Sequence, residues 1–127
     1  MAASLMDVIN RFRAEVPQFV STDVVHIETG LSLGGGSIDP NFDSSLASAS
    51  YAELVKSNAR ALDLLGLGAT ATEDILITTR QIYLLIRMIG PEHYHGLAIS
   101  RQGTLGYARA VMKKYEPQLL EAIRALS

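Results

Sequence analysis

The stretch from Ser44 to Gly66 constrains this chain more than any other, because it is long, rich in alanine and clearly delimited at both ends. Asp43, Ser44 and Ser45 each offer a side-chain oxygen to the free amides of a first helical turn. Gly66 can adopt the left-handed backbone that often ends a helix. The stretch therefore predicts a long central helix over residues 44–66, against which the other elements must pack.

The side chains of this helix predict contacts with two different surfaces. At about 3.6 residues per turn, one broad face is mainly apolar, and we expect it to cover a sheet. A flank of small side chains beside it would let another surface approach closely, and we expect that surface to be a second copy of the chain. The broad face consists of Leu46, Ala47, Ser50, Tyr51, Leu54, Asn58, Ala61, Leu62 and Leu65, and the small flank of Ala49, Ala52, Ser57 and Ala59.

Composition narrows the class of protein. The 127 residues predict a single domain, residues 1–127, that is large enough to build a core. Hydrophobic residues make up 48% of the chain and charged residues 19%, so apolar surface should remain for oligomerisation. The net charge of -2 without a basic block argues against nucleic acid and anionic membranes as partners. The first residues resemble neither a signal peptide nor a membrane anchor, so we expect a cytoplasmic protein with no membrane insertion.

The rest of the chain predicts two more helices and five strands. Ser4 is the expected cap of the first helix and Pro17 its stop. The nearly continuous apolar run from Ile82 to Ile89 predicts a strand in the middle of the sheet. Pro117 should kink or break the last helix. The predicted helices cover residues 5–16 and 104–126, and the predicted strands cover 22–28, 31–38, 75–79, 82–89 and 95–101.

This order of elements, α-β-β-α-β-β-β-α, predicts an α+β fold. Successive strands joined by short turns favour one five-stranded antiparallel sheet rather than a doubly wound parallel one. Strands that are apolar on both sides need helices on both faces. We therefore expect the central helix on one face and the two terminal helices on the other.

Two features suggest ligand chemistry but fit simpler explanations. Gly34, Gly35 and Gly36 could indicate a phosphate loop, yet no Lys-Ser/Thr pair and no helix-opening GxGxxG follows, so a bulged or weakened strand is favoured. His26 and Glu28, or His93 and His95, could share one side of a strand and hold a metal. Neither pair comes with an indicated third ligand.

The serines and arginines give no enzyme signature. Ser48, Ser50 and Ser57 lack a nucleophile-elbow context. Arginines could act in trans on the nucleotide site of another protein, but surface solvation or a carboxylate partner is the favoured explanation of each. The candidates are Arg60, Arg80, Arg87, Arg101 and Arg109. We therefore predict no catalytic residue, no cofactor, no metal and no enzymatic activity.

Four stretches carry a resemblance to a known family. They are GLSLGGGSIDP, ASASYAELVKSNARALDLLGLG, EDILITTRQIYLLIRMI and HGLAISRQGTLGYARAVM. In pattern and spacing, from Val24 through Tyr107, the chain resembles the Roadblock/LC7 family of small dimeric regulators. It departs from the family pattern in the three glycines of the second strand and in Pro117 of the last helix.

The resemblance implies a homodimer. In this family the central helices pair antiparallel, and the third strand of each copy joins one continuous sheet. Together with the small flank of the central helix, this predicts an interface made by the central helix and the third strand. Its expected residues are Ala49, Ala52, Leu54, Val55, Ala59, Leu62, Ile75, Leu76 and Ile77.

The resemblance also implies a function. Family members often act on small Ras-like GTPases or serve as scaffolds in motor and signalling complexes, and prokaryotic relatives include a partner of the gliding-motility GTPase that repositions the GTPase's own catalytic groups. We therefore expect a non-enzymatic regulator or scaffold. The alternative is a sensor domain for a small ligand, which needs a cavity between sheet and helix. The dense apolar strand at residues 82–89 argues against such a space.

Overall fold

A computed structural model describes residues 3–126, so residues 1, 2 and 127 of the predicted domain lie outside it. The structure has one five-stranded antiparallel sheet, ordered β2-β1-β5-β4-β3. This confirms the predicted α+β fold and the order of its elements. The elements are α1 (Leu5–Ala14), β1 (Phe19–His26), β2 (Ser32–Ser37), α2 (Ser44–Leu64), β3 (Asp74–Thr78), β4 (Ile82–Ile89), β5 (His93–Ser100) and α3 (Leu105–Arg124).

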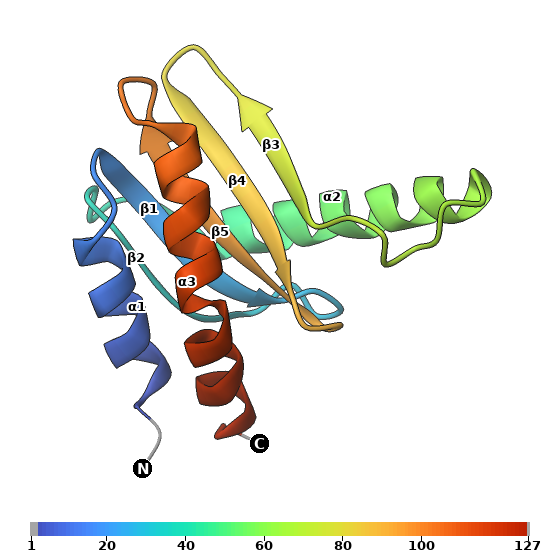
Figure 1. The fold of residues 1–127 in the computed structure, drawn as a ribbon, viewed down its shortest axis with the longest axis horizontal. Helices are drawn as coiled ribbons and strands as arrows, with labels where there is room; N and C mark the ends of the chain where they lie inside the picture. Colours follow the sequence, from blue (N-terminus) through green and yellow to red (C-terminus); the bar gives the residue numbers. More distant parts are fainter. Residues whose placement is uncertain (1–2, 127) are drawn as a thin grey trace.

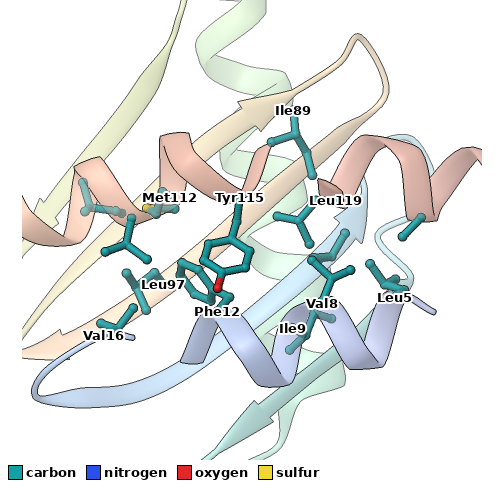
Figure 2. Packing of buried hydrophobic residues seen from close by; sticks show 14 of the residues in the cluster. Leu5, Val8, Ile9, Phe12, Val16, Ile89, Leu97, Met112, Tyr115 and Leu119 are labelled. Carbon is teal, nitrogen blue, oxygen red and sulfur yellow. The ribbon is translucent and has the colours of Figure 1, made fainter. Parts of the chain in front are cut away.

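The helices cover the sheet as predicted. In Figure 1, α1 and α3 lie side by side on the near face, and α2 crosses behind the sheet. The larger core lies between the sheet and the α1–α3 pair. Figure 2 shows its centre, where Phe12 of α1 meets Tyr115 of α3, with ring centroids 5.7 Å apart. The smaller core, under α2, contains Val25, Ala52, Val55, Ile86 and Tyr94.

The predicted caps form. The Ser4 hydroxyl accepts a hydrogen bond from the Asp7 amide at 3.1 Å, and the Asp43 carboxylate accepts one from the Leu46 amide at 3.2 Å. Gly66 follows α2 with a φ of 74°, as expected of the residue that ends a helix. Short-range signals therefore placed the start and the end of α2 correctly.

The face of α2 that packs on the sheet was predicted wrongly. The buried side chains are Ser48, Ala52 and Val55, whereas Leu46 and Leu65 of the predicted broad face are 66% and 71% exposed. Ala49 and Ala52 of the small flank lie against the turn between β1 and β2, where a Cβ at Gly30 would stand 3.2 Å from Cα of Ala49 and 3.8 Å from Cβ of Ala52. Small side chains let α2 approach its own chain, so their presence alone did not indicate a partner.

The middle strand is β5 rather than β4. The β5 residues from Tyr94 to Ile99 are all buried, whereas Leu84 and Met88 of β4 are only half-buried. β4 lies between β5 and the edge strand β3. The small residues Gly96 and Ala98 made β5 look less like a central strand than β4. β1 and β5 also begin earlier than predicted, at Phe19 and His93.

The three glycines lie within strand β2, as the simpler explanation expected. A Cβ at Gly34 would stand 2.9 Å from the sulfur of Met6, and one at Gly36 would stand 2.4 Å from a guanidinium nitrogen of Arg13. Both neighbours belong to α1, and Arg13 lies in its last turn. Glycine therefore lets α1 pack directly on β2, and the chain does not enter a helix there as a phosphate loop would.

Pro117 does not break α3, which runs from Leu105 to Arg124. Proline removes the hydrogen bond to the carbonyl of Lys113. Both residues are exposed, so water can solvate that carbonyl. Packing of Tyr115 and Leu119 in the larger core holds the helix on both sides of the proline.

Candidate functional site

The second half of α2 extends beyond the sheet. The buried α2 residues lie between Ser48 and Val55, and none of residues 56–64 is buried. Figure 1 shows the helix continuing past the edge formed by β3. The projecting end is strongly apolar, because Leu64, Leu65 and Leu67 are 88%, 71% and 63% exposed. Apolar surface of this kind is typical of a protein–protein contact. We call the segment 64–67 the leucine tip.

The outer edge of β3 is open to a further strand. Thr79 donates its amide to the carbonyl of Ile82, and Met88 donates its amide to the carbonyl of Glu73. In an antiparallel ladder, every second residue bonds inward. The amides of Asp74, Leu76 and Thr78 therefore point away from β4, and no strand pairs with them within residues 3–126. An open, apolar edge favours pairing with another chain.

The structure separates the predicted interface residues into two groups. Ala52 and Val55 are 1% and 6% exposed in the core of their own chain, so they offer no surface to a partner. The other seven remain at least partly accessible on α2 and β3: Ala49, Leu54, Ala59, Leu62, Ile75, Leu76 and Ile77. The interface stays a prediction, and Ala52 and Val55 are removed from it.

Three of the candidate arginines join separate elements of the fold. Arg109 binds Asp74 through two nitrogens, at 2.8 and 3.3 Å, and fastens α3 to β3. Arg87 lies 3.9 Å from the same carboxylate and 3.7 Å from Glu116. Arg101 donates to the carbonyl of Thr79 at 2.6 Å and stacks over a tyrosine ring. These arginines stabilise the sheet and α3.

Arg60 and Arg80 are exposed, and Arg60 donates to the Ser57 hydroxyl at 3.1 Å. Of the five, these two are best placed to contact another protein.

The histidines form no complete metal site. His26 and His93 face each other across β1 and β5 with ring centroids 5.2 Å apart. Burial lowers the pKa of His93, and the nearby charge of His26 lowers it further. Within residues 3–126, no group of three or more His, Cys, Asp or Glu side chains could hold a metal ion. The pair therefore fits a partly buried edge-to-face contact between the two rings.

His95 is buried within the larger core and is neutral. Its Nε2 lies 2.9 Å from the Thr22 hydroxyl, which donates its own hydrogen to the carbonyl of Gly96 at 2.7 Å. The Nε2 must therefore carry the proton that Thr22 accepts. Burial lowers the pKa of His95 to about 3, and the charge of Arg87 adds to this effect.

A cavity of about 280 Å³ lies between the sheet and the first half of α2. The dense apolar strand at residues 82–89 was expected to exclude such a space, and this expectation was wrong. Leu84 and Ile86 form only part of the wall, while the glycines of β2 and β5 leave room beside them. Sequence reasoning also missed Asp23, although a lone carboxylate in the β-branched strand TDVVH could have indicated it.

The arrangement of helices and sheet is similar to that of solved structures across almost the whole chain. MglB of Myxococcus xanthus matches with a TM-score of 0.85 and 15% identity, over 95% of this chain and 95% of that one. A Roadblock/LC7 domain from Streptomyces avermitilis matches with a TM-score of 0.81 and 12% identity, over 96% and 99%. The chain has the Roadblock/LC7 fold. The gliding protein MglB of Thermus thermophilus shares this Roadblock/LC7 fold, with a TM-score of 0.80 and 14% identity over 93% and 87%.

Sequence comparison alone gives no such likeness, because no protein-family model and no curated protein matches the chain. The Roadblock/LC7 fold is therefore visible in the structure and in the spacing of elements rather than in residue identities. None of the helices in the described part of the chain combines the length and apolar character that a membrane crossing requires.

Proposed function

We propose that this protein is a member of the Roadblock/LC7 family that works as a homodimeric regulator of a small Ras-like GTPase. The observation that carries the proposal is the likeness to MglB, which covers 95% of both chains. The family that the sequence resembles includes regulators and scaffolds for such GTPases. In this proposal the protein is cytoplasmic, is not an enzyme, and acts through its surface.

The proposed dimer uses the two surfaces that the single chain leaves open. The outward amides of β3 would pair with β3 of a second copy, which joins the two sheets. α2 already extends past that edge (Figure 1), so its leucine tip would reach the second copy. The seven accessible residues of the predicted interface lie on these elements. The exposed leucines support this arrangement, because a partner would remove them from water.

Replacing Leu76 with proline should weaken the dimer and leave the chain folded. The proline removes an amide that points away from β4, so the ladder between β3 and β4 keeps its hydrogen bonds. We expect dimer dissociation to increase about tenfold or more, which corresponds to about 1.4 kcal/mol. Sedimentation equilibrium measures the dissociation constant of the dimer. The matched control is Ile77→Pro, which removes an inward amide and should instead disrupt β3. A Leu76→Pro protein that dimerises as wild type would place β3 outside the interface.

The function itself is tested with small Ras-like GTPases of the source organism, loaded with GDP or with a non-hydrolysable GTP analogue. We expect binding that depends on the nucleotide. If the protein also stimulates hydrolysis, it should do so by repositioning groups of the GTPase. Alanine at any one of the five arginines should then lower the saturated rate by less than about tenfold, whereas loss of an arginine finger costs about a thousandfold or more.

Titration to saturation separates binding from chemistry, because a binding defect is overcome at high concentration. Arg80→Ala is the most informative variant, since Arg80 is exposed, and Arg109→Ala controls for loss of the contact with Asp74. A variant that binds normally yet stays inactive at saturation would identify an inserted arginine. Failure to bind any GTPase in either state would refute the proposed function.

A further inference from the structure

The cavity under α2 contains a carboxylate that forms no ion pair with any lysine, arginine or histidine in the described part of the chain. Asp23 lies on β1, half-buried, where Ser32 of β2 and Ser48 of α2 donate hydrogen bonds to its two oxygens. Burial raises the pKa of Asp23, and these hydrogen bonds oppose the rise. No ion pair involving Asp23 forms within residues 3–126. A desolvated carboxylate of this kind favours a cationic partner.

The Ser48 hydroxyl beside Asp23 is shared between two acceptors. The Ser48 hydroxyl touches a carboxylate oxygen of Asp23 and also the carbonyl of Ser44, at 2.6 Å. A hydroxyl has one hydrogen to donate. It can serve only one of these two acceptors when Asp23 is ionised. A ligand that brings N–H donors to this point could bond to whichever acceptor the hydroxyl does not serve.

The charge of the cavity wall also selects for a cation. Among the described residues that line it, the charged side chains are Asp23 and Asp39, and none is a lysine, arginine or histidine. Phosphates and carboxylates would meet like charge there. The first turn of α2 would itself favour an anion, but the Asp43 carboxylate already caps it by binding the Leu46 amide.

The remainder of the wall suits a compact apolar body. Leu84 and Ile86 come from β4, and the rings of Tyr51 and Phe42 come from α2 and the loop before it. Tyr94 is held in place by its hydroxyl, which donates to the carbonyl of Ser48 at 3.1 Å. Aromatic faces add to the binding of a cation. The volume of about 280 Å³ is close to the lower end for small-molecule sites, about 300 Å³.

Gly35 keeps the carboxylate end of the cavity open. A Cβ at this position would stand 2.4 Å from the carbonyl oxygen of Thr22 and 3.0 Å from the Asp23 carboxylate. The first contact is with backbone, which cannot move aside as a flexible side chain can. Any larger residue would thus displace β1 or rotate the Asp23 side chain.

We propose that this cavity binds a small primary amine with a compact apolar body, whose ammonium group contacts Asp23, Ser48 and the carbonyl of Ser44. This proposal does not depend on the proposed regulation of a GTPase. The apolar cavity, the carboxylate without an ion-pair partner and the shared Ser48 hydroxyl all agree with this chemistry. Such a ligand would join β1, β2 and α2 and would stabilise the position of α2.

The test uses three probes that differ chiefly in charge: benzylamine, benzyl alcohol and benzoate. Each is titrated into the full chain at pH 7 while backbone amide signals are followed by NMR. We expect saturable shifts with benzylamine at Gly35, Ser48 and Gly96. Binding of benzyl alcohol should be about tenfold weaker or more, which corresponds to about 1.4 kcal/mol, and benzoate should cause no saturable shift.

Asp23→Asn should weaken benzylamine binding about tenfold or more, and Asp63→Asn, an exposed carboxylate elsewhere on α2, should leave it unchanged. If Asp23→Asn does not fold, the carboxyl carbon of Asp23 is titrated in the wild type. Benzylamine should lower that pKa, because a bound cation favours the ionised form. Benzoate binding as tightly as benzylamine, an unchanged Asp23 pKa, or a cavity closed to benzylamine by a second copy would each overturn the proposal.

Discussion

Lowering the pH from 6.5 to 4 should destabilise the protein by about 3 kcal/mol through His95 alone. The pKa of this residue is about 3 in the folded chain, against 6.5 for a free side chain. Between these values the unfolded chain binds a proton that the folded chain does not. The contribution of His95 to the free energy of unfolding is therefore fully present above pH 6.5. Below that pH it falls by about 1.4 kcal/mol for each pH unit.

The structure explains why His95 resists protonation. The side chain is 1% exposed, and its ring centroid lies 4.6 Å from that of Phe12. Nδ1, the atom that would take the second proton, is buried without a hydrogen-bond partner among the described residues. A proton there would be a charge in an apolar core, close to the positive Arg87.

The measurement compares wild type with His95→Gln by urea denaturation across this pH range. Glutamine can still donate to the Thr22 hydroxyl but does not titrate. Hydrogen bonds with Lys114 and Ser45 lower the pKa values of Glu15 and Asp43. Acid therefore also removes the stability that these two carboxylates contribute, and it does so equally in both proteins. The difference between the two slopes should be about 1.4 kcal/mol per pH unit. Parallel slopes would show that His95 accepts its proton in the folded state.

Local signals predicted the elements of this fold well. Asp43 and Gly66 delimit α2, and Ser4 caps α1, because caps depend on residues close in sequence. The alternation of short apolar strands with turns was sufficient for an antiparallel sheet with helices on both faces. Each of these features depends on residues that lie close together in the chain, so a single sequence is enough to predict it.

Contacts between distant segments were harder to predict. The burial of β5 depends on its place between β1 and β4, which its own composition does not reveal. The Asp23 cluster joins residues from β1, β2 and α2. The orientation of α2 depends on where Gly30 allows close approach. In each case the deciding neighbour lies far away in the chain.

Ala52 shows how such a contact changes an expected result. A small residue on a long helix suggests a partner, and Ala52→Arg would then give folded monomers. In the structure Ala52 is 1% exposed and packs with Val25, Val55 and Ile86. Gly30 approaches from the turn, and a Cβ there would stand 3.8 Å from that of Ala52. An arginine at this position has no space and no partner for its charge.

We therefore expect Ala52→Arg to detach α2 from the sheet and to lower the free energy of unfolding by about 3 kcal/mol or more, from overpacking together with burial of a charge. The matched control is Ala61→Arg, because Ala61 is exposed on the same helix and should change stability by less than about 0.5 kcal/mol. Urea denaturation at two protein concentrations measures both variants. The loss in Ala52→Arg should be similar at both concentrations, since the damaged contact lies within one chain. A folded, stable Ala52→Arg monomer would instead show that this side chain contacts a second copy.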